Sequence, residues 1–106
     1  MRLLFFKEKQ MLERNFQAKV IRELKDIYPD AIIYKTDGSY LQGFPDILIL
    51  YKNKWASLEV KKSENEPRQP NQEYYVDKMN AMSFSRFICP ENKERIFDDL
   101  QLAFES

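Results

Sequence analysis

The stretch Gly43–Lys62, GFPDILILYKNKWASLEVKK, predicts a β-hairpin at the centre of the protein. Its two apolar runs, ILILY and WASLEVK, are rich in β-branched and aromatic residues and are separated by a short polar segment. The first run follows Asp46, and the second ends with Glu59 and Lys61. Because an unpaired charge is costly to bury, three charged groups where two buried strands meet require a partner or a function.

The register of this hairpin determines where the charged groups lie. Side chains alternate along a strand, so Glu59 and Lys61 point to the same side. A two-residue loop at Lys52–Asn53 pairs Asp46 with Glu59, whereas a loop at Asn53–Lys54 pairs Asp46 with Lys61. Both place the three side chains on one face, and a three-residue loop would need a bulge to do so. We therefore favour a two-residue loop, which explains the spacing.

The remaining elements predict an α/β (α+β) protein with the order α–β–β–β–α–β–α. Apolar residues from Leu12 to Ile27 recur at helical spacing over residues 9–28, and Pro29 disfavours continuation of this helix. The other predicted elements are a strand at Ala31–Lys35, a helix at Gln72–Met82 with Met79 and Met82 on one face, a strand at Ser83–Cys89 and a last helix after Pro90. A meander of three strands, followed by a helical crossover to a fourth, makes a mixed four-stranded sheet flanked by helices.

The length of 106 residues predicts a single domain over positions 1–106, because a chain of this size cannot build two cores. Apolar residues make up 43% of the chain and aromatic residues 14%, which is typical of a packed globular protein. The 17 basic and 17 acidic residues cancel, so a general basic field that attracts nucleic acid is absent. Any contact with nucleic acid must then come from local placement of charge.

The cysteine and histidine counts restrict the setting and the chemistry. Cys89 is alone, so no internal disulfide forms, and a reducing intracellular or cytoplasmic location is expected. The apolar run at positions 3–6 is too short for a signal peptide or a membrane span. The chain has no histidine, which excludes serine–histidine triads, histidine bases and histidine-ligated zinc. Catalysis would have to use carboxylates, lysine, tyrosine or a hard metal ion.

Asp46 and Glu59, held side by side, favour a divalent cation. Two neighbouring carboxylates repel each other and are costly to desolvate, and oxygen ligands suit magnesium. Lys61 beside them would orient or deprotonate an attacking water, or neutralise charge on a phosphate. At roughly 100° per residue, Glu13 projects within about 20° of Val20 and Leu24, near the middle of the apolar stripe of the first helix. A carboxylate there also needs a partner.

These residues together resemble the PD-(D/E)XK nuclease superfamily. Gly43-x-Pro45-Asp46 is followed, after twelve residues, by Glu59-Val60-Lys61, and the predicted element order resembles the αβββαβ core of that superfamily. The pattern is most similar to virus-type replication-repair nuclease (VRR-NUC) domains, which carry a glutamate in the first helix and a glutamine at the start of the next. Glu13 and Gln72 occupy those places, and the resemblance spans about residues 9–90.

The resemblance implies hydrolysis of DNA phosphodiesters that depends on Mg²⁺, or on Mn²⁺ as a substitute, and leaves 5′-phosphates. It implies that Asp46, Glu59 and the Val60 carbonyl bind the metal and that Lys61 acts on the attacking water. Glu13 would assist through a water or a second ion, and Gln72 would order the site or touch phosphate. Small domains of this kind resemble phage or prophage nucleases that cut branched, flap or four-way junction DNA in repair or recombination, often as homodimers.

Three basic residues are weaker candidates for DNA contacts: Lys35, Lys62 and Arg68. Each is equally explained as a charged surface residue. Two other functions stay open from the sequence. One is a catalytically silent nucleic-acid-binding module with the same fold, and the other is a protein-interaction domain in which the acidic cluster is structural.

Overall fold

The structure is a computed structural model that describes residues 2–106, with side chains described from residue 12 onward. Its elements follow the predicted order, and the predicted α+β class with a mixed four-stranded sheet is confirmed. The elements are α1 (Arg2–Ile27), β1 (Ile32–Lys35), β2 (Ile47–Tyr51), β3 (Lys54–Val60), α2 (Pro70–Met82), β4 (Phe84–Ile88) and α3 (Lys93–Glu105).

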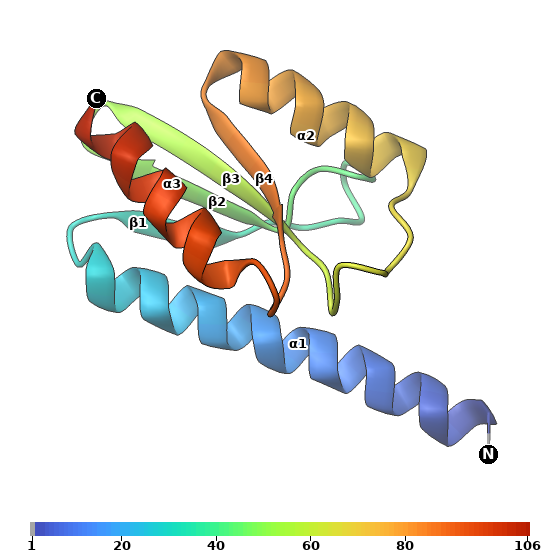
Figure 1. The fold of residues 1–106 in the computed structure, drawn as a ribbon. Helices are drawn as coiled ribbons and strands as arrows, with labels where there is room; N and C mark the ends of the chain where they lie inside the picture. Colours follow the sequence, from blue (N-terminus) through green and yellow to red (C-terminus); the bar gives the residue numbers. More distant parts are fainter. Residues whose placement is uncertain (1) are drawn as a thin grey trace.

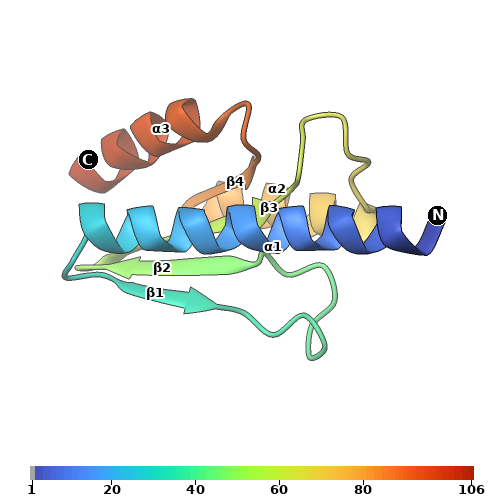
Figure 2. The same cartoon turned by 90° about the horizontal axis from the view of Figure 1, so that it is seen from below.

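The strands lie in the order β1-β2-β3-β4, and only β3 and β4 run parallel. This pattern arises because the loop at residues 36–46 and a two-residue turn join the first three strands, whereas α2 carries the chain across to β4. Helices α1 and α3 lie on one side of the sheet and α2 on the other, as the two views in Figures 1 and 2 show. The sheet is therefore the middle layer between helices.

The hydrophobic core lies between the sheet and the pair α1 and α3. Inward-facing residues of three strands meet the apolar stripes of both helices, in keeping with strand alternation. The fully buried members of this cluster are Val20, Leu24, Ile47, Ile49, Ala56, Leu58, Ile88 and Leu100. On the opposite face, α2 contacts β3 and β4 and buries Val76 and Met79. Ile32, Tyr34 and Leu50, on the face away from α1, remain largely exposed.

The hairpin has a two-residue loop, as predicted, and it is the first of the two alternatives. Tyr51 pairs with Lys54 and Ile47 with Leu58, so the turn consists of Lys52 and Asn53. Lys52 adopts a positive φ of 56°, as hairpin turns of two residues require at one or both positions. Continued by one position, the observed register places Asp46 opposite Glu59, as the Lys52–Asn53 alternative predicted.

Several boundaries and apolar faces differ from the prediction. α1 begins at Arg2 rather than near residue 9; the apolar run at positions 3–6 lies within it, but its side chains lie outside the described residues. Leu12 and Ile27 belong to the predicted apolar stripe of α1, yet they are 63% and 50% exposed. Met82, predicted to share a face with Met79, is 64% exposed because it is the last residue of α2.

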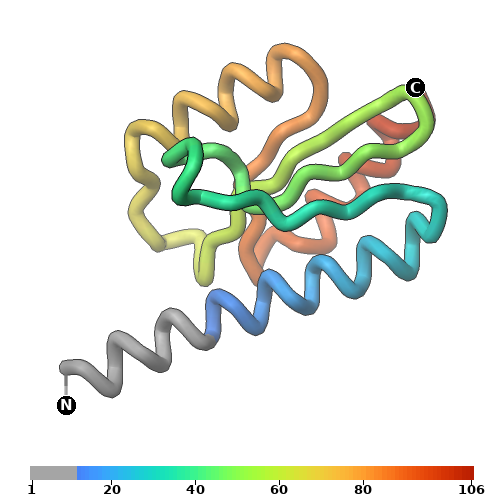
Figure 3. Tube along the Cα trace, turned by 180° about the vertical axis from the view of Figure 1, so that it is seen from behind, coloured from blue at the N-terminus to red at the C-terminus, as the bar shows by residue number. Residues whose placement is uncertain are grey.

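The loop at residues 36–46 lies against the first turns of α2, as the view from behind shows (Figure 3). Gly43 has a φ of +88°, and a Cβ there would lie 2.7 Å from the side chain of Asn71. The ring of Phe44 packs edge-on against Tyr75, with 5.9 Å between centroids. These contacts position the segment that carries Asp46 next to the helix that carries Gln72. Within residues 2–106, no helix has the length and apolar character needed to cross a membrane.

Candidate functional site

Asp46 is held at the start of β2 by bonds from both sides. The Thr36 amide donates a 2.9 Å hydrogen bond to the Asp46 carbonyl, and the Thr36 hydroxyl donates one of 2.6 Å to the Pro45 carbonyl. On the other side, the Val60 amide donates to Asp46 Oδ2 at 2.8 Å. The Asp46 carboxylate is thus fixed against β3, where Glu59 precedes Val60.

Glu59 is a buried carboxyl group beside a second carboxylate. The residue is only 4% exposed, and burial together with the nearby Asp46 charge raises its pKa to about 9. Burial also raises the pKa of Asp46, although the hydrogen bond from Val60 opposes this effect. Both shifts have the direction expected when two carboxyl groups share one desolvated place and ionise together only with difficulty.

Gln72 joins Glu59 to Lys61. Its amide nitrogen donates to Glu59 Oε2 at 2.9 Å, and its oxygen accepts a 2.7 Å bond from Lys61 Nζ. The same oxygen accepts a 3.0 Å bond from the Gln69 amide, which satisfies a free donor at the beginning of α2 as in a capping box. Gln72 therefore both caps its helix and orders two side chains of the cluster.

The loop between β3 and α2 encloses the end of Lys61. Lys61 is 6% exposed, and its Nζ donates to the Pro67 carbonyl at 3.1 Å. Glu66 lies 3.9 Å from Lys61 Nζ and accepts a 2.9 Å bond from the Lys62 amide. Glu66 was not among the predicted site residues. The loop has no periodic pattern, so the only signal in the sequence was an acidic residue five positions after Lys61.

Glu13 approaches the cluster from α1. It is half-buried, and its pKa is raised by burial first and then by the charges of Glu66 and Asp46. Lys61 and Lys62 oppose this shift. α1 thus contributes a further carboxyl group whose ionisation depends on the charges of Glu66 and Asp46.

The donor set suits a hard divalent cation. Asp46 and Glu59 offer carboxylate oxygens, and among the described side chains neither of them forms a salt bridge with a lysine or an arginine. No three acidic or other metal-ligating side chains of residues 12–106 are close enough together to hold an ion by themselves. A cation here would therefore depend on Asp46, Glu59, a main-chain carbonyl such as that of Val60, and water, as magnesium sites often do.

The three weaker candidates occupy different places. Lys35 pairs with Ile47 across β1 and β2, and its charge opposes the rise that burial causes in the pKa of Asp46. Lys62 follows Lys61 and is half-buried by the loop. Arg68 lies over the ring of Phe87, with 3.9 Å from its guanidinium carbon to the ring centroid. Since Phe87 is the strand partner of Glu59, Arg68 lies on the β4 side of the cluster.

Comparisons of the chain with models of protein families, with curated proteins and with solved structures give no match. The resemblance to PD-(D/E)XK nucleases therefore stays a prediction that rests on the residues quoted for it.

Proposed function

We propose that the protein is a metal-dependent nuclease that hydrolyses DNA phosphodiester bonds. The observation that carries this proposal is the carboxyl pair Asp46 and Glu59 beside the ammonium group of Lys61. Glu59 is buried and Asp46 half-buried, and within the described residues neither forms a salt bridge. A desolvated carboxylate pair needs a positive partner, and a divalent cation together with a phosphate would complete this charge arrangement.

Asp46, Glu59 and the Val60 carbonyl would hold Mg²⁺ or Mn²⁺. When bound, the cation would supply positive charge that offsets the charge developing on the phosphate during hydrolysis. Asp46 is already immobilised by Val60, and Glu59 by Gln72, so little reorganisation is required of either ligand.

Lys61 would contact the attacking water or a phosphate oxygen. An ammonium group has three donors, and Lys61 uses two of them for Gln72 and the Pro67 carbonyl. The third can orient a water or bind the phosphate, while the positive charge opposes the charge of the reacting group. Glu13, which approaches from α1, would accept a hydrogen bond from water at the edge of the site.

The finer features of the activity follow the resemblance. We propose products with 5′-phosphates, preference for branched, flap or four-way junction DNA, and a homodimer. One site cuts one strand, so paired cuts at a junction require two copies of the chain.

The test uses duplex, flap and four-way junction DNA with Mg²⁺, Mn²⁺ or EDTA. We expect cutting that needs the metal and falls to background in Asp46→Asn, Glu59→Gln and Lys61→Ala. Mn²⁺ should also raise the melting temperature of the wild type, but not that of Asp46→Asn, because a ligand that binds only the folded state stabilises it. Full activity of Lys61→Ala, or no cutting of any substrate, would overturn the proposal. DNA binding that persists in EDTA without cutting would favour the silent binding module instead.

A further inference from the structure

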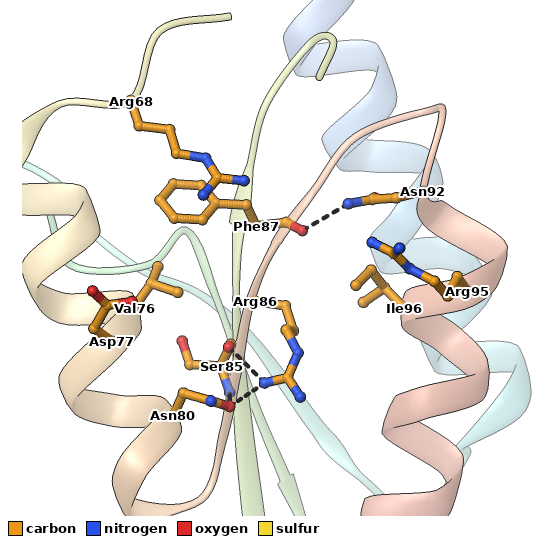
Figure 4. A pocket seen from close by; sticks show the side chains of 10 residues that line it. All are labelled: Arg68, Val76, Asp77, Asn80, Ser85, Arg86, Phe87, Asn92, Arg95 and Ile96. Atoms are coloured by element: carbon orange, nitrogen blue, oxygen red, sulfur yellow. Dashed lines mark hydrogen bonds between the residues drawn. The ribbon is translucent and has the colours of Figure 1, made fainter. Parts of the chain in front are cut away.

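A polar hollow of about 230 Å³ lies over the outer edge of β4, between α2 and α3 (Figure 4). Three arginines line it: Arg68 from the loop before α2, Arg86 from β4 and Arg95 from α3. Figure 4 shows their side chains spread around the same stretch of β4. None of the residues of the carboxylate cluster lines the hollow.

The hollow concentrates positive charge in a chain whose net charge is zero. Its lining includes three guanidinium groups but one carboxylate, that of Asp77. Among the described side chains, none of these arginines forms a salt bridge. Because opposite charges are normally placed together on a protein surface, this local excess of cations favours an anionic ligand.

Two of the guanidinium groups are held in place by stacking. Arg68 lies over Phe87, and Arg86 lies over Phe84 with 4.3 Å between its guanidinium carbon and the ring centroid. Arg86 also donates to the side-chain oxygen of Asn80 and, at 3.0 Å, to the Ser85 carbonyl. Stacking leaves the donor edge of a guanidinium group available, and such a planar fork matches the oxygens of a phosphate.

Side-chain amides occupy several backbone groups on the outer edge of β4 below the arginines. Asn80 accepts a 3.1 Å hydrogen bond from the Ser85 amide. Asn92 accepts one of 2.9 Å from the Cys89 amide and donates one of 3.1 Å to the Phe87 carbonyl. An added strand requires a row of unpaired backbone N–H and C=O groups, and an edge strand whose groups bind side-chain amides does not offer such a row. The hollow therefore suits a ligand that binds side chains rather than a peptide strand.

The hollow also adjoins the carboxylate site. Phe87 pairs with Glu59 across β3 and β4, and Arg68 follows Pro67, whose carbonyl binds Lys61. A polyanion lying across these two strands would reach both places. We propose that Arg68, Arg86 and Arg95 bind the phosphate backbone of nucleic acid next to the carboxylate site, an inference that rests on the proposed nuclease function for the identity of the ligand.

The experiment measures binding without cleavage. Fluorescence anisotropy of labelled duplex and four-way junction DNA is recorded in EDTA from 50 to 300 mM salt, for the wild type and for Arg68→Gln/Arg95→Gln. Both arginines are exposed, so this variant should fold, and its melting temperature checks that it does. The control, Lys25→Gln/Lys78→Gln, removes the same charge from exposed residues outside the hollow. Arg86→Gln is measured as a third variant.

We expect the double arginine variant to bind at least about tenfold more weakly near 0.1 M salt. The slope of log K against log salt should fall by about 2, because each duplex phosphate contact contributes roughly 0.9. The lysine control should keep the affinity and slope of the wild type. Equal affinity and slope in wild type and arginine variant would overturn the inference, as would a wild type that binds no nucleic acid.

Cleavage with Mn²⁺ is scored separately, so that the two proposals fail in different ways. Loss of salt-dependent DNA binding in the arginine variant, with no cutting by the wild type, would support phosphate binding in the hollow and overturn the proposed nuclease activity. Cutting by the wild type, with unchanged DNA binding in the arginine variant, would support the nuclease activity and overturn phosphate binding in the hollow.

Discussion

The side-chain oxygen of Gln72 lies 2.7 Å from the ammonium nitrogen of Lys61 and accepts a hydrogen bond from it. Since the amide nitrogen of Gln72 binds Glu59, one residue of α2 sets the positions of two ionisable side chains, one on β3 and one directly after it. A neutral amide can do this because it offers a donor to the carboxylate and an acceptor to the ammonium group at once.

Gln72→Leu should therefore reduce both stability and the proposed activity. The change leaves the buried side chains of Glu59 and Lys61 each without one partner, which typically costs about 1–3 kcal/mol. The free energy of unfolding from urea titration measures the first effect, and the rate of DNA cutting with Mn²⁺ measures the second. Gln101→Leu is the matched control, because Gln101 is exposed on α3. Similar losses in both variants would contradict the bridging role.

Gly43→Ala should destabilise the protein by about 1–3 kcal/mol, whereas Gly38→Ala should be nearly neutral. The first position has a φ of +88° and no room for a Cβ beside Asn71, while the second has nothing within 4 Å of the added atom. Urea denaturation of the two variants makes the comparison. An equal effect would show that the close approach to α2 does not constrain the loop that carries Asp46.

Without metal, the protein should lose stability as the pH rises from about 4.5 to about 9. Burial, and then the Asp46 charge, raises the pKa of Glu59 to about 9 from an ordinary value of 4.5. In this range the folded state holds a proton that the unfolded state has released, so the free energy of unfolding falls with pH. The raised pKa of Asp46 acts in the same direction.

Urea midpoints measured in EDTA at pH 5, 7 and 9 would record this trend. Glu59→Gln should make the dependence much flatter, because it removes the group with the large shift. Glu64→Gln, a change at an exposed glutamate, should keep the slope of the wild type. A wild type whose midpoint does not change over this range would contradict the prediction.

Lys93 and Glu23 should couple the beginning of α3 to α1. Lys93 Nζ lies 2.7 and 2.8 Å from the two carboxylate oxygens of Glu23. Lys93 is only 9% exposed. A double-mutant cycle with Lys93→Met and Glu23→Gln should give a coupling energy of about 1 kcal/mol. A coupling energy near zero would show that the pair adds nothing to stability.

The same pair has a pH signature. The hydrogen bond to Glu23 raises the pKa of Lys93 above 10.5, against the opposing effect of burial. The stability gained from the charged lysine is therefore present below pH 10.5 and is lost as the pH rises through the higher value of the folded state. Urea unfolding of the wild type and of Glu23→Gln between pH 9 and 12 would show whether the difference in their free energies of unfolding disappears as the pH rises.

The sequence predicted the hairpin and its charged end because strand alternation and turn length are local rules. With a two-residue loop they left two pairings open for Asp46, with Glu59 or with Lys61, and the structure adopts the first. The helical period likewise put Glu13 on the inner side of α1. Exposure at Leu12 and Ile27 was not predicted, because periodicity shows which face of a helix is apolar but not how much of its length a sheet of short strands covers.

Tertiary contacts explain what the sequence could not show. Glu66 joins the cluster through a loop whose course no local pattern specifies. The arginine hollow forms because α3 returns beside β4, which brings Arg95 near Arg68 although they are far apart along the chain. Arg68 was predicted as a candidate phosphate contact, but its stacking on Phe87 of β4 is a tertiary contact that the sequence did not indicate.

The Lys52–Asn53 turn lies at the opposite end of the hairpin from Asp46, and both of its residues are exposed. Exposed turns ordinarily accept insertions with little consequence. Here one added residue would either be accommodated as a bulge or shift the whole strand, and a shifted strand would turn Asp46 to the other face of the sheet. Tags, linkers or cross-linking sites are therefore better placed elsewhere, because this turn fixes the geometry of a cluster it does not touch.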